Sequence, residues 1–182
     1  YPGGKVDSLA YAPFLFELAE QGYLTNLIKM PFNLAVFNVN AASKVRDLYP
    51  SINNWYLAGH SLGGSMAASH LGSNSDKYQG LILLGSYSTK DLSNLDIKIL
   101  SIYGEFDYVL NKEHYNKNIN NLPNLVELEI KGGNHANFGY YGNQKGDGLA
   151  SITREQQIKQ TIEFIINNIN DEFTNWKIVR KV

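Results

Sequence analysis

The sequence predicts an α/β fold in three layers, a mostly parallel β-sheet with helices on both faces. Short apolar segments alternate with helical patterns along the chain, an order typical of parallel strands joined by helical crossovers. The apolar segments lack a regular alternation with polar residues, as expected of strands that are buried on both faces. The chain has 182 residues, of which 43% are hydrophobic and 18% charged, a composition typical of globular domains. We therefore expect a single domain over residues 1–182, without a cap domain.

Five apolar segments are predicted to form the strands of this sheet. Each is short and is followed by turn-forming or polar residues, which separates them from helical segments of similar hydrophobicity. The predicted strands are residues 24–30, 55–59, 80–85, 97–103 and 125–130.

Five further segments carry the spacing of amphipathic helices. Ser8 is the expected N-cap of the first helix, and Gly22 follows its end. The tail at residues 173–179 is expected to dock on the sheet of its own chain, with docking on another chain as the alternative. The predicted helices are residues 8–21, 40–48, 62–71, 112–122 and 154–168.

The chain opens directly on Tyr1-Pro2-Gly3-Gly4-Lys5, a segment with the character of a loop that follows a strand. We therefore expect the natural protein to be longer, so that the sheet in this sequence lacks one or more upstream strands.

A Gly-x-Ser-x-Gly motif, Gly59-His60-Ser61-Leu62-Gly63, lies between a predicted strand and a predicted helix. In that context the serine occupies a tight strand-to-helix turn, which exposes its hydroxyl as a nucleophile. The two glycines are needed because a Cβ at either position would collide across the turn. The alternative is a glycine-rich turn that only packs closely, but the flanking elements favour Ser61 as a nucleophile.

A serine nucleophile needs a base to take its proton and an acid to orient that base. Of the four histidines, His135 is the candidate base, because it lies in a glycine-rich loop after the last strand, at the sheet edge where sites form. His60 lies inside the motif and is expected to point away from Ser61, while His70 and His114 lie on helices. Each histidine could instead be a solvated or hydrogen-bonded side chain without a catalytic role.

The candidate acid is Asp107, which follows the predicted strand 97–103 at the same edge of the sheet. Glu105 is the rival in the same loop, and a turn-forming aspartate is the alternative interpretation. The oxyanion hole is expected to use the backbone N–H of Leu62 together with that of Gly4 or Lys5. A plain Pro-Gly turn is the alternative for that second contribution.

These motifs resemble the α/β-hydrolase superfamily, and more narrowly a bacterial α/β-hydrolase-5 group related to the dienelactone hydrolases. Serine first, acid second and histidine last is the order of that superfamily. The resemblance implies a Ser-Asp-His hydrolase with the α/β-hydrolase fold, although Ser61 stands where dienelactone hydrolases use Cys, which argues against a dienelactone substrate. It is carried by residues 1–7, 21–23, 29–34, 59–64, 103–107, 132–136, 146–148 and 153–155.

Composition limits the remaining functions. The net charge of −1 gives no reason to expect a nucleic-acid partner. The chain has no Cys, and its histidines show no metal-ligand spacing, so neither a metal nor a cofactor is expected. No apolar run reaches the roughly 18 residues that span a bilayer. The resemblance implies a membrane anchor upstream of this chain and a place outside the cytoplasm, with a cytoplasmic enzyme as the alternative; the oligomeric state is left open.

The sequence therefore predicts a serine hydrolase that cleaves small or exposed carboxylic esters through an acyl-enzyme. An amide or thioester hydrolase, an acyltransferase, or a non-catalytic binding module on the same fold are the alternatives. The interval at residues 86–96 is too short for a cap domain, so we expect an open site. The loop at residues 137–150, which holds Phe138, Tyr140 and Tyr141, is the candidate to fold over it.

Overall fold

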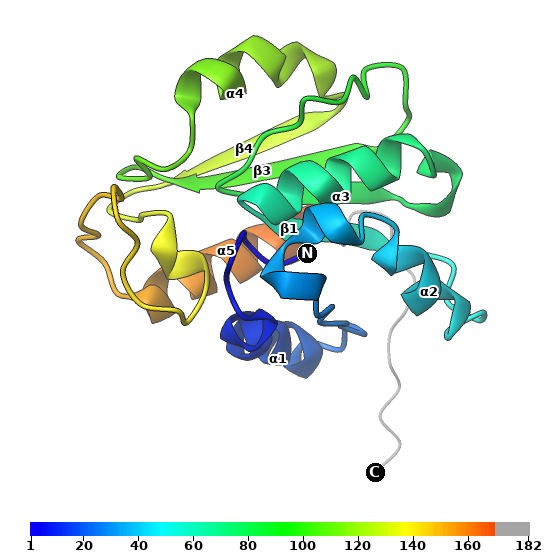
Figure 1. Ribbon diagram of the computed structural model, residues 1–182, viewed down its shortest axis with the longest axis horizontal. Helices are drawn as coiled ribbons and strands as arrows, with labels where there is room; N and C mark the ends of the chain where they lie inside the picture. Colours follow the sequence, from blue (N-terminus) through cyan, green and yellow to red (C-terminus); the bar gives the residue numbers. More distant parts are fainter. Residues whose placement is uncertain (170–182) are drawn as a thin grey trace.

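The sheet of the protein consists of four parallel strands in the order β1-β2-β3-β4 (Figure 1). The computed structural model describes residues 1–169. Neighbouring strands pair in register, with Tyr56 beside Gly80, Gly80 beside Lys98 and Ile99 beside Leu125. All four strands therefore end at one edge, where the loops that follow them meet. The strands are β1 (Tyr56–His60), β2 (Gly80–Leu84), β3 (Lys98–Gly104) and β4 (Leu125–Ile130).

Helices cover both faces of this sheet, and short 3-10 turns connect the elements. The α-helices are α1 (Ala12–Glu20), α2 (Ala41–Asp47), α3 (Leu62–Gly72), α4 (Lys112–Asn118) and α5 (Arg154–Ile169). The 3-10 helices are η1 (Ser8–Tyr11), η2 (Pro31–Asn33), η3 (Ala35–Phe37), η4 (Ser75–Lys77), η5 (Ile119–Asn121) and η6 (Ala136–Phe138).

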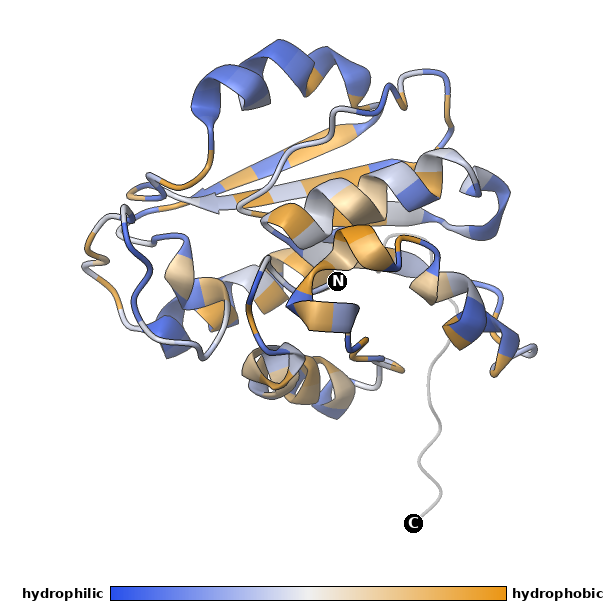
Figure 2. Cartoon of the chain, viewed as in Figure 1, coloured by the Kyte–Doolittle hydropathy of each residue, from blue (hydrophilic) through white to orange (hydrophobic). Residues whose placement is uncertain are grey.

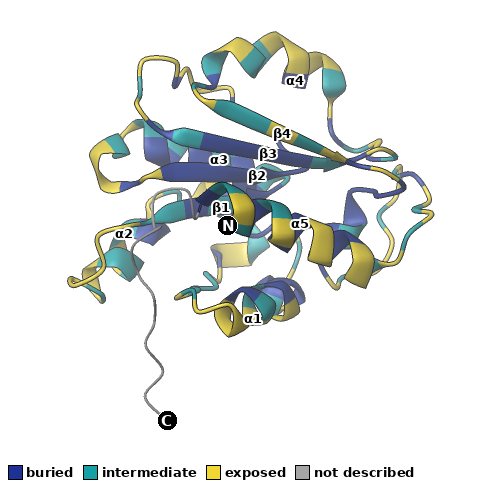
Figure 3. Cartoon of the chain, turned by 180° about the vertical axis from the view of Figure 1, so that it is seen from behind, coloured by how far each residue is buried: buried dark blue, intermediate teal, exposed yellow. Residues whose placement is uncertain are grey.

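Successive residues of a strand point to opposite faces of the sheet and pack into two separate hydrophobic cores. Leu81 and Ile99 join the core beneath α3, which contributes Ala67, Ala68 and Leu71. Ile82 and Leu100 join the opposite core, which packs against α1 and α5. Helix α3 lies in front of the sheet in Figure 1 and α5 lies in front of it in Figure 3, where β2 and β3 are largely buried and β4 is mostly intermediate or exposed. Full burial of each such side chain contributes about 1.5–3 kcal/mol, and burial on both faces explains why β2 and β3 show no regular alternation with polar residues.

The α4 helix at the β4 edge of the sheet is largely hydrophilic (Figure 2). It buries only Tyr115, whose hydroxyl meets Ser101 of β3 at 2.8 Å. The predicted helix at residues 112–122 thus consists of α4 followed by η5.

The strand predicted at residues 24–30 is wrong, since the structure has no strand there. The outer edge of β1 is occupied instead by the backbone of Tyr1. Its nitrogen donates to the carbonyl of Ala58 at 2.7 Å, and its carbonyl accepts the N–H of His60 at 3.1 Å. A strand needs a hydrogen-bonded neighbour, and this pairing leaves residues 24–30 without one at β1.

The first predicted helix is divided into η1 and α1, and its N-cap is Asp7 rather than Ser8. The Asp7 carboxylate accepts the N–H of Leu9 at 2.9 Å, an interaction that a serine one position later does not make here. Gly22 follows the end of α1 with φ +93°, as its predicted place after the helix requires.

The docking predicted for residues 173–179 lies outside the described residues. Over residues 1–169, no helix is long and apolar enough to cross a membrane.

Candidate active site

Ser61 occupies a strained turn between β1 and α3, with φ 53° and ψ −125°. Only glycine fits at the positions two residues before and two residues after Ser61. A Cβ on Gly59 would stand 2.5 Å from the carbonyl carbon of Gly63, and a Cβ on Gly63 would stand 2.3 Å from the carbonyl oxygens of Tyr1 and Pro2. The backbone conformation of Ser61 costs about 1–3 kcal/mol and persists only where the surrounding structure enforces it. The turn therefore has the geometry expected of a nucleophile elbow.

Asp107 and His135 form a buried pair at the same edge of the sheet. Nδ1 of His135 lies 2.9 Å from both carboxylate oxygens of Asp107, and both side chains are 1% exposed or less. The carboxylate also accepts the N–H groups of Val109 at 3.1 Å and Leu110 at 2.8 Å. These contacts fix the carboxylate, which in turn fixes the orientation of the imidazole.

The other ring nitrogen of His135 is the one left to act as a base. Nε2 is buried and has no hydrogen-bond partner among the described residues. The ring centroid of His135 lies 4.4 Å from that of His60, the neighbour of Ser61 in the elbow. A hydrogen bond between the Ser61 hydroxyl and His135 is not formed in this structure; such bonds often tighten only when substrate binds.

The expected oxyanion donors differ in whether their N–H groups are free. Within residues 1–169, the N–H groups of Gly4 and Leu62 make no hydrogen bond. The N–H of Lys5 donates to the carbonyl of Asn33 at 2.8 Å, which removes Lys5 from the candidates. Gly4 lies against the elbow, since a Cβ on it would stand 3.1 Å from Cδ2 of Leu62. Gly4 and Leu62 are thus the pair whose donors remain available.

Gly85, at the end of β2, is a site residue that sequence reasoning missed. It is buried and has φ +50°. A Cβ on it would stand 2.7 Å from Oδ2 of Asp107 and 2.8 Å from Nδ1 of His135. Its place at the end of the predicted strand 80–85 is the only signal in the sequence, since the need for glycine arises from loops that lie far along the chain.

Asp147 is a second residue whose role the sequence did not reveal. Its carboxylate accepts the backbone N–H groups of His135 at 3.3 Å, Ala136 at 2.8 Å and Gly148 at 2.9 Å. Asp147 therefore holds the backbone on which the imidazole stands. The Gly146-Asp147-Gly148 segment carried part of the family resemblance, without indicating this contact.

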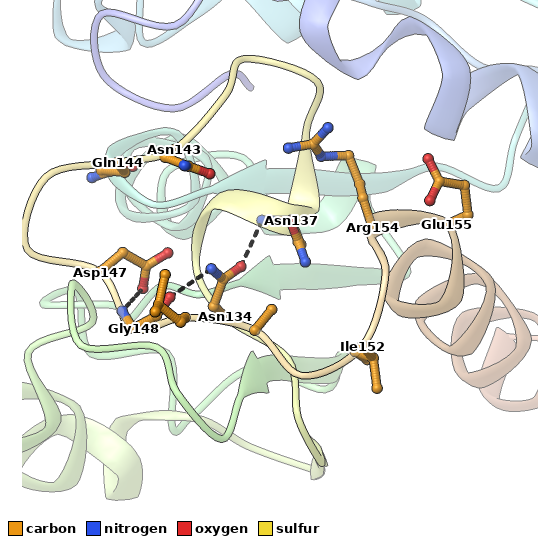
Figure 4. A pocket seen from close by; sticks show the side chains of 11 residues that line it. Asn134, Asn137, Asn143, Gln144, Asp147, Gly148, Ile152, Arg154 and Glu155 are labelled. Atoms are coloured by element: carbon orange, nitrogen blue, oxygen red, sulfur yellow. Dashed lines mark hydrogen bonds between the residues drawn. The ribbon is translucent and has the colours of Figure 1, made fainter.

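Asn134 ties the same loop to α5. Its N–H donates to Oε1 of the buried Gln157 at 3.0 Å, and its carbonyl accepts Nε2 of Gln157 at 2.8 Å. Its side chain donates to the carbonyl of Gly148 at 2.8 Å and accepts the N–H of Asn137 at 3.0 Å, as Figure 4 shows. Helix α5 thus serves as a rigid support for the loop that carries His135.

Glu105, the rival acid, does not contact His135 in the part of the chain that the structure describes. Its exposed carboxylate accepts the N–H of Gly132 at 2.9 Å and lies 3.8 Å from Nζ of Lys131. Gly132 has φ +74°, so Glu105 supports the turn that leads into the His135 loop rather than the imidazole.

The loop at residues 137–150, predicted to be able to fold over the site, is tied to its surroundings. The N–H of Tyr140 donates to the carbonyl of Ala10 at 2.8 Å, and its hydroxyl donates to Glu155 at 3.1 Å. The Arg154 guanidinium stacks over the Tyr140 ring at 4.9 Å. This loop lines a polar pocket of about 370 Å³ (Figure 4), whose walls include neither Ser61 nor Asp107 nor His135.

Two other histidines lie in different settings. Nε2 of the buried His70 lies 3.0 Å from the hydroxyl of Tyr78, and the His114 ring faces that of Tyr87 at 5.7 Å. Within residues 1–169, no three His, Asp or Glu side chains gather in a way that could hold a metal ion.

A strained serine after a parallel strand, beside a buried Asp-His pair at the same edge, defines the class of hydrolases with a nucleophile elbow. The sequence matches the model of the alpha/beta hydrolase family over residues 1–159. The chain therefore belongs to the alpha/beta hydrolase family, and hydrolysis is the class of activity that goes with this family. A search of curated proteins found no match.

Solved structures of other hydrolases share the fold at low sequence identity. A monoacylglycerol lipase from Paleococcus ferrophilus is 12% identical with a TM-score of 0.70, and the match covers 91% of this chain and 92% of the lipase. A thermophilic esterase from Thermogutta terrifontis is 12% identical with a TM-score of 0.69, covering 95% of this chain and 89% of the esterase. A methylesterase from Arabidopsis is 10% identical with a TM-score of 0.67, and the match covers 94% of this chain and 97% of the methylesterase.

Proposed function

We propose that the protein is a serine hydrolase that cleaves carboxylic esters through an acyl-enzyme formed on Ser61. The observation that carries the proposal is the buried Asp107–His135 pair, with Nδ1 held at 2.9 Å from both carboxylate oxygens and Nε2 unpartnered. An imidazole held in this way has one free nitrogen to take a proton from a serine. The esterases and the lipase that share the fold support the same class of reaction.

The mechanism follows from these positions. Ser61 Oγ attacks the ester carbonyl while Nε2 of His135 takes its proton, and Asp107 stabilises the imidazolium that forms. The N–H groups of Leu62 and Gly4 bind the oxyanion, each such donor contributing about 3 kcal/mol in the transition state. The imidazolium then protonates the leaving alcohol, and a water activated by the same nitrogen releases the acid.

We propose a substrate with an exposed ester bond, held by one hydrolase domain without a cap. Between β2 and β3, residues 85–97 form only a loop, which supports an open site. On the Gly4 side the wall is apolar, since a Cβ on Gly4 would approach Cδ2 of both Leu62 and Leu34. Phe32 and Phe37, which lie within three residues of Leu34 in the sequence, are 85% and 61% exposed, with ring centroids 5.7 Å apart. These rings favour esters with an apolar acyl or alkyl group.

The test is pre-steady-state hydrolysis of p-nitrophenyl esters of increasing acyl length. We expect a burst of p-nitrophenol with one equivalent per enzyme, and its loss in Ser61→Ala. Ser65→Ala is the matched control. Ser65 lies in the first turn of α3, and its hydroxyl donates to the carbonyl of Tyr87 at 2.7 Å. Equal hydrolysis by Ser61→Ala and the wild type would reject the proposal, as would a folded wild type that a fluorophosphonate probe does not label. Hydrolysis of matched amide and thioester substrates, measured in the same way, separates an esterase from an amide or thioester hydrolase.

A further inference from the structure

Two buried titratable residues beside the site, Tyr11 and His60, have no part in the proposed proton transfer. They are 6% and 2% exposed. Oη of Tyr11 lies 2.7 Å from Nδ1 of His60 and accepts the N–H of Gly3 at 3.0 Å. The contact is close-fitting, since a Cβ on Gly3 would stand 2.9 Å from Oη of Tyr11 and 3.0 Å from Nδ1 of His60. Tyr11 thereby connects the Gly3-Gly4 segment, here called the oxyanion loop, to the side chain of His60, which precedes Ser61.

The same His60 ring packs on the candidate base. Its centroid lies 4.4 Å from that of His135 and 5.6 Å from that of Phe138. His60 therefore lies between the Gly3-Gly4 backbone and the His135 imidazole. Catalysis requires these two groups to keep a constant distance and orientation relative to each other.

The hydrogen-bond pattern places the protons. Tyr11 Oη accepts from Gly3, and within residues 1–169 its own hydrogen has no acceptor other than Nδ1 of His60. We infer that Tyr11 donates to Nδ1 and that the neutral His60 ring carries its proton on Nε2, which is buried without a hydrogen-bond partner among the described residues. With the proton on Nδ1, two buried groups would be unsatisfied, the Tyr11 hydroxyl hydrogen and the Nε2 lone pair; with the proton on Nε2, only the Nε2–H group is.

His60 is also a neutral group beside a site where charge develops. Burial, and then the proximity of His135, lower the pKa of His60 well below its usual value. The titratable groups that act on its ring are Tyr11, His135, Tyr141 and the amino group of Tyr1, and none of them is a carboxylate. A neutral His60 does not oppose the positive charge that His135 acquires during catalysis.

We propose that Tyr11 and His60 are positioning residues that set the oxyanion loop against the catalytic imidazole. The Tyr11 hydroxyl holds the Gly3-Gly4 backbone so that the Gly4 N–H faces the carbonyl under attack, and the His60 ring supports His135 from the same side. The proposal rests on the proposed hydrolase function, because it assigns these residues a role in the same reaction. Neither residue touches the reacting atoms.

The test is Tyr11→Phe, which keeps the ring and removes only the hydroxyl. We expect kcat to fall about tenfold with KM within about twofold, since a misdirected oxyanion donor acts on the transition state more than on the bound ester. Affinity for a trifluoromethyl ketone, whose hemiketal oxyanion occupies the same position, should weaken by a similar factor. His60→Phe should show the same loss, and the double variant should be no worse than either single variant, because both remove one shared hydrogen bond.

The chain offers a matched control in its other buried Tyr-His pair. The hydroxyl of Tyr78 lies 3.0 Å from Nε2 of His70, and Tyr78 and His70 are 4% and 1% exposed. Tyr78→Phe removes an equally buried hydroxyl from a histidine, and we expect it to lower thermal stability without changing kcat or ketone affinity by more than about twofold.

Any of four outcomes would overturn the proposal. The first is a folded Tyr11→Phe with wild-type kcat and ketone affinity, and the second is an equal loss in Tyr11→Phe and Tyr78→Phe. The third needs no variant: long-range ¹H–¹⁵N spectra of the wild type that place the His60 proton on Nδ1. If the fluorophosphonate probe fails to label the wild type, the proposed hydrolase function fails first. If the wild type and Tyr11→Phe are labelled at the same rate, only the positioning role fails.

Discussion

Nδ1 of His135 lies equally far, 2.9 Å, from the two carboxylate oxygens of Asp107, although the two residues follow different strands. The pair is possible because β3 and β4 are parallel neighbours and their loops leave the sheet at one edge. It is also possible because the residue that faces the pair, Gly85, has no side chain.

Replacing Gly85 with alanine should disable the site without unfolding the protein. The new Cβ would stand 2.7 Å from Asp107 Oδ2 and 2.8 Å from His135 Nδ1, so the pair must separate. A displacement of about 1 Å typically costs about a hundredfold in kcat. Gly142→Ala is the control, because Gly142 also has positive φ, +89°, yet its Cβ would meet nothing within 4 Å. Both variants should lose about 1 kcal/mol from backbone strain, whereas kcat should fall only in Gly85→Ala. Equal kcat values in the two variants would contradict the prediction.

Asp107→Asn should lower kcat by about 10³–10⁴-fold, because an amide no longer enforces the productive imidazole tautomer or stabilises the imidazolium. The fold should survive, since the remaining carbonyl oxygen still accepts the N–H groups of Val109 and Leu110. Glu105→Gln tests the rival acid and should change kcat by less than about threefold, because its carboxylate contacts Gly132. Steady-state kinetics on one p-nitrophenyl ester decides between them. A larger loss in Glu105→Gln would transfer the orienting role to Glu105.

Asp147→Ala should lower both stability and kcat, because three backbone N–H groups of the His135 loop lose their acceptor. Hydrogen bonds to charged groups are worth about 1.5–3 kcal/mol each, so we expect the free energy of unfolding to fall by at least about 2 kcal/mol. The accompanying loss of loop order should cost about tenfold in kcat. Asp91→Ala is the comparison, since Asp91 accepts the N–H of Ser93 at 2.9 Å in a loop that does not carry His135. Urea unfolding and kinetics on both variants provide the measurement, and an unchanged kcat in Asp147→Ala would show that the loop holds its place without this carboxylate.

The protein should lose stability in mild acid because of His60. Burial lowers the pKa of His60 in the folded state well below 6.5, so below that pH the unfolded chain binds a proton that the folded protein does not. The stabilisation is therefore fully present above about pH 6.5 and is lost as the pH falls toward the folded-state pKa, at about 1.4 kcal/mol per pH unit. Urea unfolding at a series of pH values should give a steeper slope for the wild type than for His60→Asn. Identical slopes would mean that His60 is protonated in the folded protein.

Much of the candidate site follows from local sequence. Gly59 and Gly63 predict the elbow because the steric demand of the turn lies within five consecutive residues. Asp107 and His135 are predictable from the sequence because each follows a predicted strand, and parallel strands end at one edge. Distance along the chain does not obscure such residues when their positions relative to strand ends are known.

Other features depend on partners that the sequence does not name. The segment at residues 24–30 has the composition of a strand, but Tyr1 occupies the β1 edge. The sequence does not separate Lys5 from Gly4 as an oxyanion donor, whereas in the fold the carbonyl of Asn33 accepts the N–H of Lys5. In both cases a backbone group already has a hydrogen-bond partner elsewhere in the fold, which local patterns do not reveal.

The sequence by itself determined the layered α/β class, the turn that carries Ser61 and the edge of the sheet where chemistry is expected, because these depend on hydrophobic spacing and on the sterics of adjacent residues. Only the tertiary structure decided that Gly85 must lack a side chain, that Asp147 holds the His135 loop, and that Tyr11 reaches Gly3 and His60 together. Those relations are contacts between surfaces from distant parts of the chain, and close packing makes each depend on the exact shape of its partner.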